Sequence, residues 1–107
     1  MFYRVNERDT EMEIKSTIWI AEIERKVIMK HNVQPYEVDE LLANNPYFRF
    51  VEKGRVQGED MYFAMGQADS GRYLVAFFIY KGGQEALMIS ARDMSERERK
   101  AYDRAKK

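Results

Sequence analysis

The pattern of hydrophobic and polar residues changes period along the first half of the chain. It alternates from Glu11 to Trp19, which is typical of a half-exposed strand, and we expect this strand to be antiparallel and near a sheet edge. From Ile20 to His31 apolar residues recur at helical spacing, which predicts a helix that Asn32 can end in a left-handed conformation. A second helix should begin at Gln34-Pro35 and end at Asn44-Asn45-Pro46. The short connection predicts a helical hairpin.

Strand-like segments follow Pro46 until residue 92, and short turns that contain glycine separate them. The expected strands are residues 47–51, 59–65, 72–80 and 86–91. Short turns between successive strands indicate an antiparallel meander. The segment from Tyr73 to Tyr80 is apolar on both faces, which is typical of a central strand covered on at least one side, and one face is a possible subunit interface.

Ser95 and Glu98 have the spacing of a capping box, which predicts a last helix that runs to about Ala105. Its apolar face is thin and includes Tyr102. The expected fold is therefore α+β, with the helical hairpin and this C-terminal helix packed on a four- to five-stranded antiparallel sheet. With 107 residues the chain has the size of one domain, which we expect at residues 11–107 after an N-terminal extension at 1–10.

Composition narrows the functional classes. No apolar run is long enough to span a bilayer and no secretory signal is evident, so we expect a cytoplasmic protein without membrane contact. The absence of cysteine excludes disulfides, a thiolate zinc site and a cysteine nucleophile. One histidine and scattered carboxylates give little support for a metal site, and the glycines match no nucleotide-binding fingerprint. We expect neither a metal nor another cofactor.

The net charge is zero, but it is unevenly distributed. Residues 1–46 contain six Lys/Arg and nine Asp/Glu, whereas residues 47–107 contain twelve and nine. The basic excess of the second half lies from Arg92 onward. Affinity for nucleic acid depends largely on basic contacts with phosphates, so any RNA site in this chain should be local.

Several short motifs occur in a specific order. They are Trp19, Lys30-His31-Asn32-Val33, Gly58-Glu59-Asp60-x-Tyr62, Gly66, Ser70-Gly71-Arg72-x-Leu74-Val75, Ile89-Ser90-Ala91-Arg92 and Ser95-x-x-Glu98-Arg99-x-x-Tyr102. Over about residues 14–104 the chain thereby resembles the BrnT family, toxins of bacterial type II toxin–antitoxin pairs with a RelE-like fold. The resemblance implies a small ribonuclease that inhibits translation, a ribbon-helix-helix antitoxin (BrnA) that neutralises it, and a complex that represses its own operon.

The chain departs from the family pattern at four positions. Asn32 stands where the family commonly has glycine, and Met61, Gln67 and Leu87 stand where arginines are usual. The three missing arginines would account for the neutral total charge.

RNA cleavage through the 2′-hydroxyl without a metal needs a base, a cation for the phosphate and an acid for the leaving oxygen. Arg72 and Arg92 suit the cation role, because a guanidinium holds phosphate at two points. His31 and Glu59 are the candidate bases, and Tyr102 is a candidate acid or stacking surface. Further candidate RNA contacts are Lys30, Arg97 and Arg99.

Each candidate also has a structural interpretation. His31 can interact with the last carbonyls of its helix, and Glu59 can form an ion pair with Arg92 that orients strands. Arg72 is alternatively a solvated strand-edge residue, and Tyr102 a core anchor for the last helix. The basic residues from Arg97 to Arg104 alternate with acids and resemble a solvated helix face.

Two functional hypotheses follow. In the first, the protein is a BrnT-like ribonuclease toxin. In the second, it is a catalytically inactive relative that binds an antitoxin-like partner or forms a homodimer, as the neutral charge and the missing arginines favour. A DNA-binding module is a third and weaker hypothesis, because the sequence offers no recognition helix.

Overall fold

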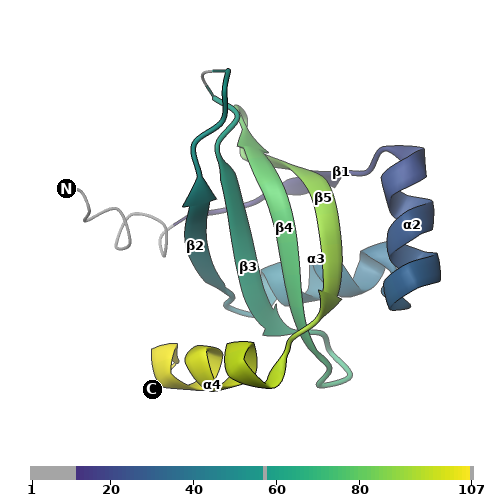
Figure 1. The fold of residues 1–107 in the computed structure, drawn as a ribbon, viewed down its shortest axis with the longest axis vertical. Coiled ribbons are helices and arrows are strands. Elements are labelled where there is room, and N and C mark those ends of the chain that lie inside the picture. Colours follow the sequence, from purple (N-terminus) through teal and green to yellow (C-terminus); the bar gives the residue numbers. More distant parts are fainter. Residues whose placement is uncertain (1–11, 57, 107) are drawn as a thin grey trace.

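The computed structural model describes residues 12–56 and 58–106, and the expected extension at 1–10 lies outside the described residues. The elements in chain order are β1 (Ser16–Ile18), α2 (Ala21–His31), α3 (Pro35–Ala43), β2 (Tyr47–Glu52), β3 (Met61–Gln67), β4 (Tyr73–Lys81), β5 (Glu85–Asp93) and α4 (Glu96–Ala105). Figure 1 shows one sheet with α3 behind it and α4 across one end of its front. The α+β class expected from the sequence is confirmed.

The five strands form one sheet in the order β1-β5-β4-β3-β2. Strands β2 to β5 are an antiparallel meander with β4 at the centre, as the pattern predicts. The first strand differs from the prediction in two ways, because it is only three residues long and pairs with β5 in parallel. Alternation reports which face a residue occupies but contains no information about the direction of the partner strand. The sheet is therefore mixed, although mostly antiparallel.

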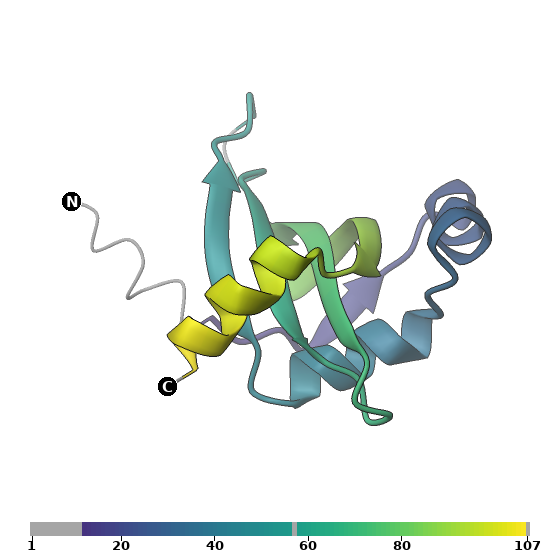
Figure 2. The same cartoon turned by 60° about the horizontal axis from the view of Figure 1, so that its bottom comes forward.

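The two helices after β1 contact different parts of the sheet: α2 packs on β5, and α3 packs on β3 and β4 (Figures 1 and 2). They are consecutive and closely connected, as expected, but they diverge along the sheet. Asn32 ends α2 with φ 53° and Pro35 is the first residue of α3, both as the sequence predicts. The structure adds a capping box between Gln34 and Glu37 at the start of α3.

The sheet has a hydrophobic cluster on each face. The larger cluster lies under α2 and α3 and includes Phe78, Leu41, Met88 and Val38, all completely buried. The smaller one lies under α4, where Tyr102 packs with Met65 and Val75. Because α4 covers only one end of its face, the rest of that face carries half-buried side chains (Figure 2).

We call this partly covered surface the open face. It comprises Arg49, Met61, Phe63, Phe77, Ile79, Leu87, Ser90 and Arg92, which strand alternation and register place on the same side as Met65 and Val75. None of the helices in the described ranges is long and apolar enough to cross a membrane.

Candidate active site

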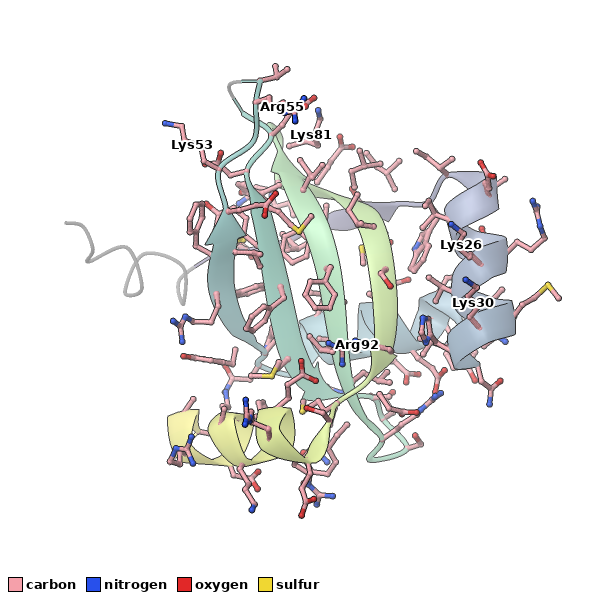
Figure 3. All side chains as sticks on the ribbon, viewed as in Figure 1. Lys26, Lys30, Lys53, Arg55, Lys81 and Arg92 are labelled. Carbon is pink, nitrogen blue, oxygen red and sulfur yellow. The ribbon has the colours of Figure 1, made fainter. Side chains whose placement is uncertain are left out.

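Arg92 lies on the open face near the end of β5, beside the start of α4 (Figure 3). Its Nη1 donates to Glu98 Oε1 at 2.7 Å and its Nη2 to Glu98 Oε2 at 2.9 Å, while Nη1 also donates to the Asp93 carbonyl at 3.2 Å. The guanidinium carbon is 5.4 Å from the centre of the Phe77 ring. The position of Arg92 is therefore fixed by a carboxylate at one edge and a ring beneath it.

These contacts leave part of the Arg92 guanidinium available. The group has five N–H donors. Glu98 and the Asp93 carbonyl engage both donors of Nη1 and one of Nη2, whereas Nε makes no hydrogen bond with any described residue. The Nε and Nη2 edge can thus still donate two parallel hydrogen bonds, the arrangement that fits two phosphate oxygens.

Arg72 has no comparable free edge. Its Nε and Nη2 bind Asp93 at 2.8 and 3.3 Å, and Nη2 also reaches the His31 carbonyl at 3.1 Å. Its Nη1 binds the Asn32 carbonyl at 2.7 Å and Glu37 Oε1 at 3.1 Å. The side chain thereby joins the end of α2, the first turn of α3 and the end of β5. Arg72 is a brace between elements rather than the solvated edge residue that the sequence allows as an alternative.

His31 and Lys30 lie in the last turn of α2, next to this brace. The His31 side chain is half-buried and its imidazole makes no hydrogen bond within the described residues. The hydrogen bond from Arg72 lowers the pKa of Asp93, and the nearby His31 adds a smaller effect in the same direction. Lys30 is exposed and forms no ion pair with a described residue (Figure 3).

Glu59 lies at the other end of the sheet. Its Oε2 is 3.3 Å from the Nζ of Lys81, the last residue of β4. Arg92 is opposite Val75, six residues earlier on that strand, which corresponds to about 20 Å at the rise of an extended chain. The alternative in which Glu59 pairs with Arg92 is therefore wrong, because each has another partner. The structure does not bring Glu59 together with His31, Arg72 or Arg92.

Tyr102 is the residue through which α4 packs on the sheet. Its side chain is only 7% exposed, and its ring meets that of Tyr73 edge to face at 6.0 Å. Burial raises the pKa of its hydroxyl. One turn earlier, the Arg99 guanidinium lies 3.7 Å above the centre of the Tyr73 ring, and Arg97 and Arg99 are both exposed. The geometry of Tyr102 matches the core-anchor interpretation.

The structure also reveals residues that the sequence reasoning missed. Arg49 pairs with Phe63, Phe63 with Phe77, and Phe77 with Ser90, so these four form one row across the open face. Alternation within each strand indicates that they share a face, but only the register places them side by side. Two of the four departures from the family pattern also lie close together, because Met61 and Leu87 are both opposite Ile79.

Within residues 12–56 and 58–106, no group of three or more His, Asp or Glu side chains is arranged to hold a metal ion.

Comparison with known proteins decides the family. A family model described as "Ribonuclease toxin, BrnT, of type II toxin-antitoxin system" matches residues 19–98. The chain belongs to the BrnT family. Membership implies an antitoxin partner. A crystal structure of the ribonuclease toxin BrnT of Brucella abortus has a similar fold, with a TM-score of 0.55 and 18% sequence identity, over 76% of this chain and 97% of that one. No curated protein sequence matches the chain.

Proposed function

We propose that this BrnT-family protein is an active ribonuclease toxin of the cytoplasm that cleaves RNA without a metal ion and is neutralised by a ribbon-helix-helix antitoxin of the BrnA type. Family membership supports a ribonuclease toxin, and the free guanidinium edge of Arg92 is the observation that supports this residue as the phosphate-binding site. In this mechanism a base removes the proton of a ribose 2′-hydroxyl, that oxygen bonds to the adjacent phosphorus, and the 5′-oxygen leaves and is protonated.

Arg92 would bind the phosphate through Nε and Nη2. Glu98 holds the opposite edge of the guanidinium, so this cation is already oriented before RNA arrives. The Glu98 carboxylate itself is a poor base, because its hydrogen bonds with Arg92 lower its pKa to about 2.

His31 is the better candidate for the base. Its imidazole is not held by a hydrogen bond in the described structure, and it lies near the Asp93 carboxylate at the end of β5. Asp93 and Arg92 project to opposite faces of β5, so His31 would have to reach the phosphate around the end of this strand. Arg72 would act indirectly, by fixing the end of α2 on which His31 sits. The buried position of Tyr102 and the distant position of Glu59 favour structural roles for both.

The test is single-turnover cleavage of a mixed-sequence RNA by the purified protein in the presence of EDTA. Arg92→Lys keeps the charge but loses the two-point geometry, and we expect the rate to fall at least about tenfold, or roughly 1.4 kcal/mol of barrier. His31→Gln should cause a similar loss. Arg104→Lys, a change at an exposed residue of α4, is the matched control and should have no effect. Glu59→Gln and Tyr102→Phe should retain most of the activity.

Two results would contradict the proposal. A folded wild-type protein that leaves RNA intact at low salt would exclude an active nuclease. Cleavage that survives Arg92→Lys but is lost in Glu59→Gln would move the site to the opposite end of the sheet.

The second candidate is a binding protein without nuclease activity. Met61, Ile79 and Leu87 favour it, because they form an apolar row on the open face and two of them stand where the family commonly has arginine. An inert protein that forms a stable homodimer, or a complex with its antitoxin that Leu87→Arg disrupts, would support this candidate.

A further inference from the structure

Four residues with different side chains form the row that crosses the open face of the sheet. Arg49 on β2 begins it, the rings of Phe63 and Phe77 on β3 and β4 occupy the middle, and Ser90 on β5 ends it. The rings meet edge to face, with centres 5.9 Å apart and planes at 69°. Both side chains are half-buried. The next row toward α4, which contains Met65 and Val75, is the one that Tyr102 covers. Aromatic surface therefore remains accessible beside the covered end of the sheet.

Positive charge adjoins both rings. Arg92 lies over Phe77 and retains a free guanidinium edge. Arg49 donates from Nη1 to the Tyr47 hydroxyl at 2.9 Å, and its Nη2 makes no hydrogen bond with a described residue. Its Nε is unpaired but buried, so Nη2 is the donor that a phosphate can reach. The row is thus flanked by two arginines with unused donors.

Further lysine and arginine side chains lie around the open face (Figure 3). Lys26 and Lys30 lie on α2 at one side, and Lys53, Arg55 and Lys81 lie at the end of the sheet away from α4. Lys26, Lys30, Lys53 and Arg55 form no ion pair with a described residue, whereas Lys81 is paired with Glu59. A single strand of RNA that crosses the open face would therefore have cationic side chains on more than one side.

We propose that the row from Arg49 to Ser90 is a base-stacking platform for single-stranded RNA, with nucleobases on Phe63 and Phe77 and flanking phosphates on Arg49 and Arg92. This inference rests on the proposed function and adds a substrate preference to it. Aromatic side chains stack on bases that are already unpaired, and a duplex does not offer such bases. The platform therefore selects unpaired RNA next to the cleavage site. A purely apolar protein segment would leave the free donors of both arginines unsatisfied.

The test separates binding from cleavage. We would measure binding of the full-length protein to a 2′-O-methyl RNA of about ten nucleotides, which cannot be cleaved through the 2′-hydroxyl, and to inorganic polyphosphate, which has no bases. Phe63→Leu and Phe77→Leu remove the rings but keep apolar bulk, and each should weaken RNA binding about tenfold. Polyphosphate binding should be unchanged in Phe63→Leu, whereas Phe77→Leu should also weaken it slightly, because the Phe77 ring supports Arg92. Arg49→Gln should weaken both. Phe50→Leu, on the other face of β2, is the matched control.

The outcomes are distinguishable from those of the cleavage assay. Ring-dependent binding of the 2′-O-methyl RNA by a protein that does not cleave would support the platform and contradict the nuclease. Cleavage with unaltered RNA affinity in both leucine variants, or a preference for the matching duplex, would overturn the platform. Dimers in sedimentation experiments that Phe63→Leu or Phe77→Leu dissociates would also overturn it, because the face would then be a self-interface.

Discussion

Arg72 and Arg92 have the same side chain and lie close to strand ends, yet the fold uses them differently. All the donor positions of Arg72 are taken by carboxylates and carbonyls from three elements. Arg92 is held by Glu98 and the Asp93 carbonyl, and its Nε and one N–H of Nη2 have no partner among the described residues. At the scale of single residues, the number of free N–H donors separates a structural arginine from a candidate phosphate ligand.

This difference predicts that Arg72→Ala chiefly reduces stability. Glu37, whose side chain is 12% exposed, would lose its cation, and the carbonyls of His31 and Asn32 would lose a donor. We expect the free energy of unfolding in urea to fall by about 2–3 kcal/mol. Arg104→Ala, at an exposed site, should change it by less than about 0.5 kcal/mol. Equal stability of the two variants would show that the brace contributes nothing.

At the scale of elements, α4 depends on its first turn and on Tyr102. Ser95 Oγ accepts from the Glu98 amide at 3.1 Å, and the Glu98 carboxylate accepts from the Ser95 amide at 2.8 Å. The same carboxylate binds Arg92, so the capping box is linked directly to β5. A local helix-start signal thus also fixes how the helix meets the sheet.

The pH dependence of stability should report this link. The hydrogen bonds between Glu98 and Arg92 lower the pKa of the Glu98 carboxyl from 4.5 to about 2. The ionised carboxylate therefore stabilises the fold fully above about pH 4.5, and this stabilisation is lost as the pH falls toward about 2. With 28% of the side chain exposed, we expect Glu98→Gln to lower the unfolding free energy at neutral pH by only about 1–2 kcal/mol.

Urea denaturation of wild type and Glu98→Gln across the acidic range would measure this effect. The difference in unfolding free energy should close between about pH 4.5 and pH 2. Glu96→Gln, at an exposed position in the same turn, should show a much smaller difference. A gap between wild type and Glu98→Gln that stays constant over this range would argue against the lowered pKa.

At the scale of the whole molecule, a neutral chain presents a local arrangement of cations. Equal numbers of acidic and basic residues give no net charge. Some acidic side chains are already neutralised by a cationic partner, since Glu98 pairs with Arg92 and Glu59 pairs with Lys81. RNA affinity would therefore come from a few phosphate contacts and aromatic stacking rather than from a general positive field.

The salt dependence of RNA binding should be correspondingly shallow. With two to four phosphate contacts, the slope of log affinity against log salt should be about −1.5 to −3, because single strands give about −0.7 per contact. Anisotropy of a labelled 2′-O-methyl RNA between about 50 and 200 mM salt would measure it. Arg92→Gln should reduce the slope by about one contact and Arg104→Gln should not. A steep slope would indicate a larger electrostatic site than the one described.

The prediction of the fold succeeded where local chemistry decides structure. Apolar periodicity and proline position located both helices before residue 46, Asn32 ended the first of them, and Ser95 with Glu98 began the last. The meander and the central position of β4 also followed from the order of strands and turns. The parallel pairing of β1 and the separate packing sites of α2 and α3 did not, because both depend on contacts distant in sequence.

For the candidate site, too, the sequence predicted some features and only the tertiary structure decided the others. The sequence alone determined the α+β class, the order of helices and strands, the resemblance to BrnT and the list of candidate residues. The tertiary structure decided which of them share a location: it placed Glu59 at the far end of the sheet, buried Tyr102 and engaged every donor position of Arg72. It also brought Arg49, Phe63 and Phe77 into one row. Strand register and ion-pair partners are set by packing between distant segments, and a local pattern of residues does not specify them.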